Sequence, residues 1–347
     1  MAPIKLLIID DSAFNREVIR NILDDAEDIE VIGEATDGRE GLKLALELEP
    51  DVITLDIEMP RMDGFTFLRI LMRKKPLPVI VVSSHSAKPE VFQALEFGAL
   101  DFLAKPDERL NNPKYVWAEV LLRKVRLVRG LRAHTVLDRK FSRAPHIVAG
   151  AASRTLQHQE KPRADKIVCF GAATGGPQAL EFVFGQIKPK SNIAYIISQQ
   201  MPGAFTSAFA KRLNQGSQLT IMEAKNGAPI LANHVYVAPG NQHLALQDGN
   251  LVLTPAQDDE TSVPSVDQLF SSAAQDFATR SVGVVLTGAG SDGALGAKAI
   301  HDAGGFCLAE SEESAVFAEM PLAAYSGGGV REMLSLQELV TYLKNNI

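Results

Sequence analysis

The stretch KLLIIDDSAFNREVIRNIL, residues 5–23, joins a short apolar run to a segment with helical spacing through two adjacent aspartates. Four more apolar runs follow, and residues with helical spacing separate them. The five runs are Lys5–Ile9, Ile29–Glu34, Val52–Leu55, Val79–Val82 and Leu100–Leu103. Strands that alternate with helices in this way predict an α/β domain with a five-stranded parallel sheet covered on both faces.

Chemically reactive side chains follow the ends of these runs. Asp10 and Asp11 follow the first run, Asp56 the third, Ser83 the fourth and Lys105 the fifth. In an open parallel sheet these ends meet at one edge, where ligands bind. Three clustered carboxylates repel one another unless a cation joins them, and their oxygens suit Mg²⁺. A carboxylate beside Mg²⁺ can also attack a phosphoryl group, whereas the alternative is simple capping of a helix by a loop acid.

The charge is distributed unevenly along the chain. Residues 1–122 hold 14 Lys and Arg against 23 Asp and Glu, whereas residues 123–163 hold 11 against 2. Residues 164–347 are acidic again, and the whole chain has a formal net charge of −7. Both acidic parts would repel phosphate, so no nucleic-acid partner is expected. The basic segment, a helix from about Pro113 to Ala133 and then a tether, is either a solvated face or a surface that docks on an acidic part.

Length and composition limit the class of protein. A chain of 347 residues predicts two domains, and 46% hydrophobic residues are typical of a soluble globular protein. No apolar run approaches the ~20 residues of a membrane-spanning helix, and the first residues do not resemble a signal peptide. We therefore expect a cytoplasmic protein that is not embedded in a membrane. With only two cysteines, neither a disulfide framework nor a cysteine zinc site is expected.

The C-terminal part, from about Lys166, has glycine-rich turns between strand-like and helix-like segments. Three such turns are Gly171–Pro177, Gln199–Gly203 and Gly288–Gly293. A strand, a glycine turn and a helix N-terminus together form a place for an anion or an oxyanion. The pattern predicts a second doubly wound αβα domain.

Residues 1–122 resemble the receiver domain of two-component response regulators, on the strength of IIDDSAFNR, LDIEMPRMDG and AKP. The resemblance implies a flavodoxin-like fold and phosphorylation at Asp56 by a histidine kinase of the chemotaxis type. It implies that Asp10, Asp11 and Asp56 bind Mg²⁺. The receiver switch would comprise Ser83, Phe102 and Lys105, and the Lys105–Pro106 bond would be cis.

Residues 165–347 resemble the catalytic domain of the CheB family of chemotaxis methylesterases, and residues 123–164 would be a basic helix extension and linker. The motifs are FGAATGG, SQQMPGAFTSAFAKRLN, VYVAPGNQHLAL, PSVDQLFSSAA and LTGAGSDGALG. The family hydrolyses methyl esters of receptor glutamates, and some members deamidate receptor glutamines, with a serine, a histidine and an aspartate. The resemblance implies that cytoplasmic segments of chemoreceptors are partners.

Two of the three catalytic positions of the family differ in this chain. The turn G-A-S-T-G-G of the family has Ala173 in place of serine, and Q-H-M-P has Gln200 in place of histidine, whereas Asp292 is kept. Alanine has no nucleophilic atom, and a glutamine amide does not accept a proton near neutral pH. We therefore predict a degenerate member with no or very weak hydrolase activity. The expected oxyanion site comprises Thr174, Gly175, Gly176 and Ala289.

The function predicted from sequence is a phosphorylation-controlled chemotaxis response regulator whose second domain binds rather than cleaves. The alternative is an active methylesterase or glutamine deamidase with a displaced nucleophile. Candidates for that nucleophile are Thr174, Ser198 and Ser291, and the histidines of this half are His234, His243 and His301. Another alternative is that Ala173 is an engineered substitution. Without a histidine partner, Asp292 is expected to cap the helix that begins at Gly293 or Ala294. A DNA-binding regulator ranks last, because the second half is acidic and has no recognisable helix-turn-helix.

Overall fold

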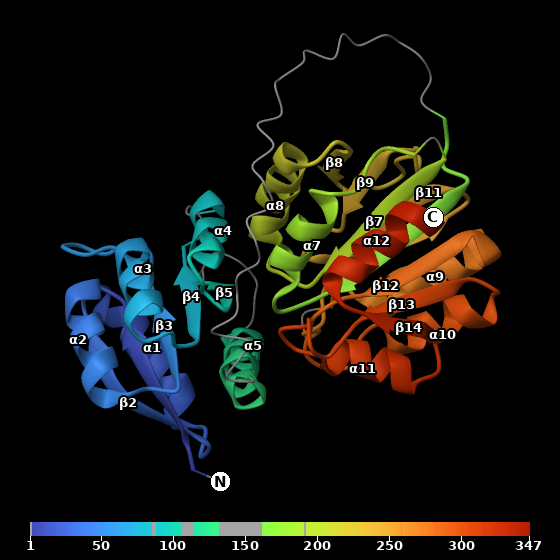
Figure 1. Ribbon diagram of the computed structural model, residues 1–347. Helices are drawn as coiled ribbons and strands as arrows, with labels where there is room; N and C mark the ends of the chain where they lie inside the picture. Colours follow the sequence, from blue (N-terminus) through green and yellow to red (C-terminus); the bar gives the residue numbers. More distant parts are fainter. Residues whose placement is uncertain (1, 85–87, 106–113, 132–161, 191, 258) are drawn as a thin grey trace. The chain divides into compact units, whose positions relative to one another are not determined.

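A computed structural model describes residues 2–84, 88–105, 114–131, 162–190, 192–257 and 259–347. The chain divides into two compact units, Met1–Arg139 and Lys140–Ile347, and each is described by itself (Figure 1). The cis bond expected at Lys105–Pro106 lies outside the described residues, and so does the tether expected after residue 133, except for its last residues, 162–165. None of the helices in the described ranges is long and apolar enough to cross a membrane.

The N-terminal unit contains the predicted five-stranded parallel sheet, in the order β2-β1-β3-β4-β5. Its strands are β1 (Ile4–Ile9), β2 (Ile29–Ala35), β3 (Val52–Leu55), β4 (Val79–Ser83) and β5 (Asp101–Ala104). Its helices are α1 (Ala13–Asp24), α2 (Gly38–Leu48), α3 (Gly64–Lys74), α4 (Lys88–Glu96) and α5 (Lys114–Arg126), followed by the 3₁₀ turn η1 (Leu127–Gly130). The expected boundary at residue 122 falls inside α5.

Local sequence signals account for the starts of three of these helices. The side chains of Ser12, Asp37 and Asp63 accept hydrogen bonds from first-turn N–H groups of α1, α2 and α3. These caps satisfy backbone donors that have no partner within the helix. All residues of β3 and β4 are buried, as in a parallel sheet with helices on both faces. The reactive residues after β1, β3, β4 and β5 are therefore held on a rigid edge.

The described part of the basic segment is docked on the acidic N-terminal unit. Lys124 forms an ion pair with Asp101, and Arg126 and Arg129 both pair with Asp28. On its apolar side, α5 buries Trp117, Leu121 and Val125 in the core of this unit. Residues 123–130 thus combine ion pairs to two aspartates of this unit with arginines that remain partly exposed, so both interpretations of the basic segment stay open.

The C-terminal unit contains a seven-stranded parallel sheet in the order β14-β13-β12-β6-β7-β9-β8, and an antiparallel hairpin formed by β10 and β11. Its strands are β6 (Lys166–Ala172), β7 (Ile193–Gln199), β8 (Thr220–Glu223), β9 (His234–Val237), β10 (Gln242–Gln247), β11 (Asn250–Pro255), β12 (Ser281–Val285), β13 (Phe306–Glu310) and β14 (Val330–Leu334). Its helices are α7 (Gly176–Phe184), α8 (Gly203–Gly216), α9 (Val266–Phe277), α10 (Ala294–Asp302), α11 (Glu319–Ser326) and α12 (Leu336–Asn346), with the 3₁₀ turn η2 (Ala278–Arg280) after α9. The doubly wound α/β class is confirmed, whereas the sequence analysis did not foresee the hairpin.

Alternate residues of β6 face opposite layers of this unit. Cys169 lies in a core cluster with Phe270 of α9 and Ile300 of α10. The neighbouring Phe170 packs its ring against Phe184 of α7, with 5.1 Å between the centroids. Because successive side chains of a strand alternate between its faces, helices cover both sides of β6. The loops that follow β12, β6 and β7 therefore lie together at one edge of a buried sheet.

Candidate functional site

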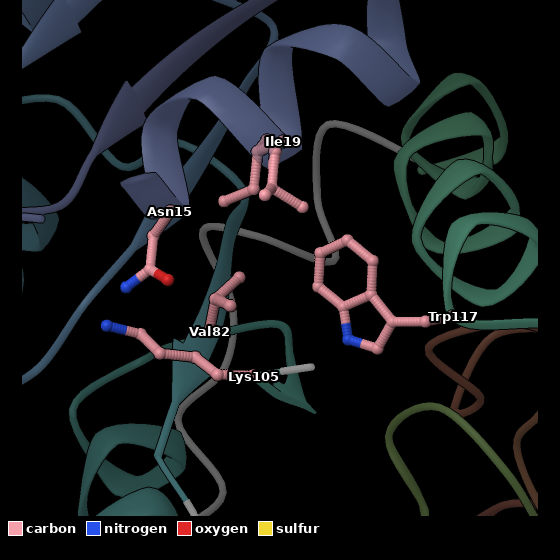
Figure 2. A pocket seen from close by; sticks show the side chains of 6 residues that line it. Asn15, Ile19, Val82, Lys105 and Trp117 are labelled. Carbon is pink, nitrogen blue, oxygen red and sulfur yellow. The ribbon is translucent and has the colours of Figure 1, made fainter. Parts of the chain in front are cut away.

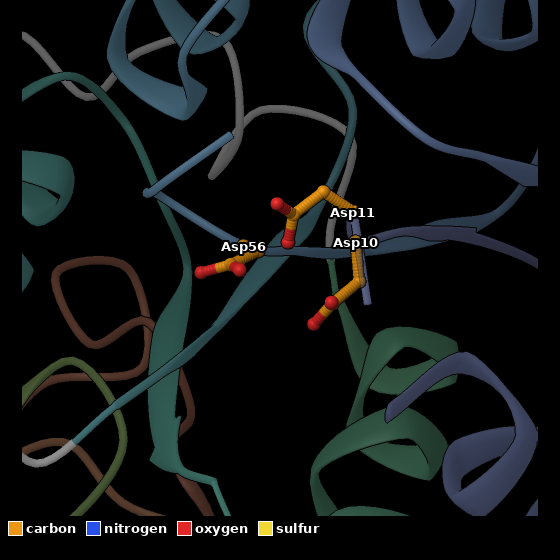
Figure 3. A group of neighbouring side chains, drawn as sticks. All are labelled: Asp10, Asp11 and Asp56. Atoms are coloured by element: carbon orange, nitrogen blue, oxygen red, sulfur yellow. The ribbon is translucent and has the colours of Figure 1, made fainter. Parts of the chain in front are cut away.

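The first candidate site is an acidic cluster of Asp10, Asp11 and Asp56. Strands β1 and β3 are neighbours, with Ile9 opposite Leu55, so the aspartates that follow them emerge side by side. One carboxylate oxygen from each of the three lies within 4.8 Å of the others (Figure 3). Asp10 and Asp56 are buried and Asp11 is exposed. The sheet therefore brings together the three acids that the sequence predicted.

Lys105, which follows β5, bridges two members of this cluster. Its Nζ lies 2.9 Å from Oδ2 of Asp10 and 2.6 Å from Oδ2 of Asp56. Burial raises the pKa of Asp56, and Asp10 adds to this rise, although Lys105 opposes it. Burial would lower the pKa of Lys105, but its hydrogen bonds and ion pairs with the two aspartates outweigh burial and raise it. Lys105 is therefore a charged ammonium group that neutralises much of the cluster's repulsion.

The donor set of the cluster fits a hard divalent cation. All three side chains offer carboxylate oxygens, which Mg²⁺ prefers. Asp10 is already oriented, because its Oδ1 accepts hydrogen bonds from the Ser12 N–H at 2.9 Å and from Nδ2 of Asn15 at 3.3 Å. A cation here would be held by Asp10, Asp11 and Asp56, and it would compete with Lys105 for two of them.

Ser83 is the last residue of β4, and Phe102 is the second residue of the neighbouring strand β5. The Ser83 hydroxyl is fully buried, and no hydrogen-bond partner is found for it among the described residues. A buried donor without a partner is costly, and at this edge it suits an incoming oxygen ligand. Phe102 is buried and meets Phe92 of α4 edge-on at 5.9 Å. Its ring therefore faces inward in this structure.

A small pocket borders the acidic cluster on the side of α1 and α5. Figure 2 shows Lys105 and Asn15 at one end of this pocket and Trp117 at the other, with Ile19 and Val82 between them. Nε1 of Trp117 donates to the Ala104 carbonyl at 2.6 Å, directly before Lys105. The single tryptophan of the chain is thus attached to the backbone that carries Lys105.

The second candidate site lies in the C-terminal unit, where three turns meet. Strand β6 lies between β12 and β7, with Gly171 opposite both Val285 and Ser198. The turns after these three strands carry Ala173, Gln200 and Asp292. Nε2 of Gln200 donates to Oδ2 of Asp292 at 2.8 Å, and the Gln200 N–H donates to the Ala172 carbonyl at 2.9 Å. The structure therefore brings the three expected positions to one sheet edge.

Backbone conformation and close packing define the turn after β6. The Ala173 side chain is only 7% exposed, and a Cβ added to Gly288 would lie 2.9 Å from its methyl carbon. Gly175 has φ 84° and begins α7, and a Cβ added to Gly176 would lie 2.0 Å from Oε1 of Gln199. Thr174 is buried, and its carbonyl accepts a hydrogen bond from Oγ1 of Thr287 at 2.9 Å. Ala289 is half-buried in the neighbouring turn.

The capping role expected for Asp292 is wrong in its choice of helix. Asp292 does not cap α10, the helix that follows it, but accepts from the N–H groups of Val266 and Asp267 in α9, at 2.8 and 2.9 Å. Its Oδ1 also accepts from the Ser265 hydroxyl at 3.2 Å. The tertiary fold brings the first turn of α9 against the turn that carries Asp292, so the nearest unpaired donors belong to another helix.

The buried serine and the two buried histidines that could supply a hydroxyl or an imidazole near this site have other partners. Oγ of Ser198 is buried and donates to the Pro264 carbonyl at 3.1 Å, whereas Ser291 is exposed. Nδ1 of His243 accepts from the Ser265 N–H at 3.1 Å, and Nε2 of His243 contacts Glu260. His234 is buried, and its Nδ1 bonds to the Ala232 carbonyl. These contacts assign structural roles to the buried serine and to both buried histidines.

Ser265 and Asp267 also belong to this site, although neither was predicted from the sequence. Both belong to the motif PSVDQLFSSAA, which contributed to the resemblance without any role for single residues. Oδ1 of Asp267 accepts from the N–H groups of Gly293 and Gly296 at 2.9 and 2.6 Å. A serine and an acid at the start of a helix are typical of capping, so the sequence could have indicated that they cap a helix. It could not have indicated that Asp267 caps α10 and not its own helix.

Comparison with known proteins bears on both units. The family described as CheB methylesterase matches residues 168–343, and the family described as response regulator receiver domain matches residues 6–112. A protein from Geobacter sulfurreducens named protein-glutamate methylesterase/protein-glutamine glutaminase 3 is 43% identical over 98% of this chain and 96% of its own length. The chain belongs to the CheB methylesterase family.

A second relative matches nearly the whole chain, and one solved structure matches its C-terminal part. Protein-glutamate methylesterase/protein-glutamine glutaminase 1 from Myxococcus xanthus is 40% identical over 97% of this chain and 95% of its own length. The crystal structure of the catalytic domain of CheB methylesterase from Thermotoga maritima aligns with 52% of this chain and 98% of its own, at 31% identity and a TM-score of 0.49. The two family matches and the relatives aligned over nearly their whole length show that the chain combines a receiver domain with a CheB methylesterase domain, as in a chemotaxis response regulator.

Proposed function

We propose that this CheB-family protein is a phosphorylation-controlled regulator whose methylesterase domain has lost hydrolysis and acts by binding. The observation that carries the proposal is the pairing of Gln200 with Asp292 beside Ala173. This arrangement retains the acid of the family's triad and replaces both groups that react. In a studied serine hydrolase, losing the nucleophile or the base alone costs about 10⁶ in rate, so the second loss adds little.

In the receiver domain, Asp56 would be the residue that becomes phosphorylated. One of its carboxylate oxygens attacks the phosphorus of a phosphohistidine on a partner kinase, and the P–N bond breaks with its electron pair on the imidazole nitrogen. The product is an acyl phosphate on Asp56. A Mg²⁺ ion held by Asp10, Asp11 and Asp56 would neutralise charge on the phosphoryl oxygens.

Two further residues of the receiver suit the phosphorylated state. Lys105 already contacts Asp56 and can move its ammonium group to a phosphoryl oxygen. The buried Ser83 hydroxyl, which has no partner among the described residues, can donate a hydrogen bond to a second phosphoryl oxygen. Phosphorylation would thereby change the contacts at the ends of β4 and β5, and a shift between two states requires such differential contacts. Phe102 on β5 is in position to respond.

In the methylesterase domain, the retained geometry supports binding of a receptor segment. The turns that carry Ala173, Gln200 and Asp292 lie together at one edge of the sheet. There the uncharged side chain of Gln200 donates a hydrogen bond to Asp292. The names of the relatives refer to protein glutamate esters and protein glutamine, which makes cytoplasmic segments of chemoreceptors the partners to test. Phosphorylation at Asp56 would control access to this edge.

The competing function is hydrolysis by a displaced nucleophile, which the names of the relatives favour. Against it stands the burial of Ser198 and its hydrogen bond to Pro264. Ser291 is exposed, and Thr174 is buried with its carbonyl bound to Thr287. A rewired enzyme would have to break the Ser198 contact or use Ser291, the exposed residue directly before Asp292.

The test is methanol release from methyl-labelled chemoreceptor membranes by the full chain phosphorylated at Asp56. The wild type is expected to be silent, and an Ala173→Ser/Gln200→His double variant is expected to gain activity, because Asp292 is already placed to orient a histidine at position 200. Each single variant should remain silent. Methanol release by the wild type above the blank would overturn the proposal, and Thr174, Ser198 and Ser291 would then be substituted in turn.

A further inference from the structure

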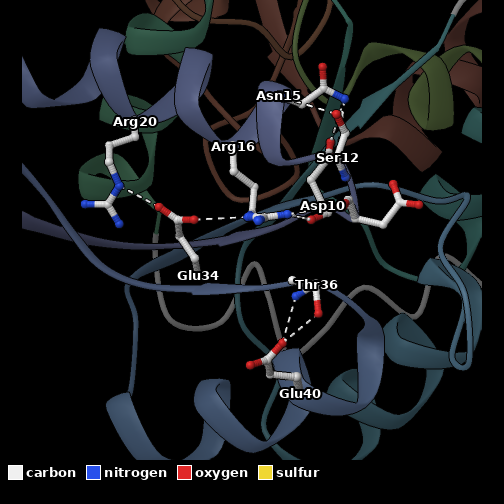
Figure 4. A network of polar contacts seen from close by, with 9 residues as sticks. Asp10, Ser12, Asn15, Arg16, Arg20, Glu34, Thr36 and Glu40 are labelled. Atoms are coloured by element: carbon white, nitrogen blue, oxygen red, sulfur yellow. Dashed lines mark hydrogen bonds and ion pairs between the residues drawn. The ribbon is translucent and has the colours of Figure 1, made fainter.

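An arginine behind the acidic cluster holds the backbone from which two of its acids project. Nη1 of Arg16, on α1, donates to the carbonyl oxygen of Asp10 at 2.8 Å (Figure 4). It also donates to the carbonyl oxygen of Asp11 at 3.2 Å. The Arg16 side chain is 15% exposed; its hydrogen bond to Asp10 is partly buried, whereas the one to Asp11 lies at the surface. A guanidinium group has a fixed planar set of donors, and two carbonyls bound to one nitrogen restrict the turn between them.

Glu34 of β2 fixes the other side of the same guanidinium group. Its Oε2 accepts from Nε of Arg16 at 3.0 Å, and its Oε1 accepts from Nε of Arg20 at 2.5 Å. Burial alone would raise the pKa of Glu34, but the hydrogen bonds from Arg20 and Arg16 outweigh it and lower this pKa. Glu34 is therefore ionised near neutral pH and offsets the positive charge behind the acidic cluster.

We propose that Arg16 is a positioning residue for the cation site: held by Glu34, it fixes the turn of Asp10 and Asp11 and thereby sets the affinity for Mg²⁺. This inference rests on the proposed binding of Mg²⁺ by Asp10, Asp11 and Asp56. Arg16 does not touch the cation or the phosphoryl group. It acts through two main-chain carbonyls, as groups that orient metal ligands generally do.

Electrostatics and positioning predict opposite effects when Arg16 is neutralised. A positive charge near a cation site repels the cation, so its removal would strengthen binding if charge alone mattered. If Arg16 instead holds the turn in place, its removal weakens binding although the repulsion is relieved. The sign of the change therefore distinguishes the two roles.

Arg20 provides a matched control on the same helix. It pairs with Glu34 as Arg16 does, and no contact between it and the carbonyls of Asp10 or Asp11 occurs among the described residues. Arg16→Gln and Arg20→Gln each remove one positive charge and one partner of Glu34. Only the first removes the hydrogen bonds to the turn.

The experiment measures Mn²⁺ binding to the full chain by the loss of the free-ion signal in electron paramagnetic resonance, and then displacement of Mn²⁺ by Mg²⁺. We expect Arg16→Gln to weaken Mg²⁺ binding about tenfold and Arg20→Gln to change it less than twofold. Arg16→Lys keeps the charge and should recover only part of the affinity. Salt screens the effects of surface charges but not the position of the turn. The tenfold loss should therefore persist at high ionic strength. An unchanged or tighter affinity in Arg16→Gln would overturn the proposal.

A second variant and the wild type complete the design. If Arg16→Gln shows no melting transition and so does not fold, Glu34→Gln is tested instead. This variant keeps Arg16 but removes the carboxylate that holds it. We expect it to bind Mg²⁺ more weakly than the wild type, at low and at high salt alike. Equal affinity in Glu34→Gln and the wild type would then contradict the proposal. If the wild type itself binds no Mn²⁺, and Asp56→Ala is indistinguishable from it, the proposed cation site fails rather than the role of Arg16.

Discussion

Asp267 and Asp292 cap each other's helices. Asp292 precedes α10 but accepts hydrogen bonds from the first turn of α9, whereas Asp267 lies in α9 and accepts from Gly293 and Gly296 at the start of α10. Burial raises the pKa of Asp267, the backbone hydrogen bonds oppose this, and the charge of Asp292 adds to it. The exchange gives Asp292 a structural role that does not depend on a catalytic histidine. Capping of α9 is therefore a physical reason for Asp292 to be present although positions 173 and 200 hold alanine and glutamine.

Replacing Asp292 should therefore destabilise the methylesterase domain even though we expect no catalysis to be lost. We expect Asp292→Ala to cost about 2 kcal/mol, because several buried donors lose their acceptor, while relief of repulsion with Asp267 offsets part of the loss. Asp292→Asn should cost less. Calorimetric melting of the full chain measures this, and Trp117 fluorescence identifies the receiver's own transition. Asp302→Ala, at an exposed ion pair with Lys298, is the control and should be almost neutral. Similar melting of both alanine variants would refute the capping role.

Glu310 should make the same domain less stable as the pH rises. It is fully buried, and burial raises its pKa from 4.5 to about 7, although Ser314 and the Thr287 N–H oppose this. Between these two pH values the folded state binds more protons than the unfolded state, so stability falls as pH increases from about 4.5 to 7 and then levels off. The fall is at most about 3 kcal/mol. Calorimetric melting from pH 5 to 8 should show a smaller decline in Glu310→Gln than in the wild type, and parallel curves would count against this assignment.

Lys105 should stabilise the receiver when no cation is bound. In Lys105→Gln the buried carboxylates of Asp10 and Asp56 face each other without a counter-charge, so we expect a lower melting temperature without Mg²⁺. Added Mg²⁺ should restore most of the loss and bind more tightly than in the wild type, because it no longer competes with an ammonium group. Lys43→Gln, at an exposed pair with Glu47, is the control and should not respond. A melting deficit that Mg²⁺ leaves untouched would contradict this account.

The buried hydroxyl of Ser83 should matter for phosphorylation rather than for stability. Because it has no partner among the described residues, Ser83→Ala loses no hydrogen bond and should melt at or above the wild-type temperature. The amount of acyl phosphate that forms at Asp56 should fall several-fold. Gel retardation of the protein after treatment with acetyl phosphate measures this amount. Thr54→Val removes another partnerless buried hydroxyl, two residues before Asp56, and should phosphorylate normally. Equal phosphate levels in both variants would argue against a role for Ser83.

The sequence alone was sufficient for the fold class and for the acidic cluster. The periodicity of residues 5–103 predicted five parallel strands, and a parallel sheet necessarily gathers the residues after its strands at one edge. Asp10, Asp56 and Lys105 could thus be placed together without coordinates. The positions Ala173, Gln200 and Asp292 were instead taken from the resemblance to the CheB family, which has a serine and a histidine at the first two.

Only the tertiary structure decided which partner each polar group has. Asp292 caps α9 rather than its own helix, Ser198 is bound to Pro264, and Arg16 holds two carbonyls while Glu34 holds Arg16. These contacts join residues far apart in sequence, and they depend on where side chains point once helices have packed on the sheet. Periodicity reports which face of an element is buried, but it carries no information on which loop of another element that face will meet.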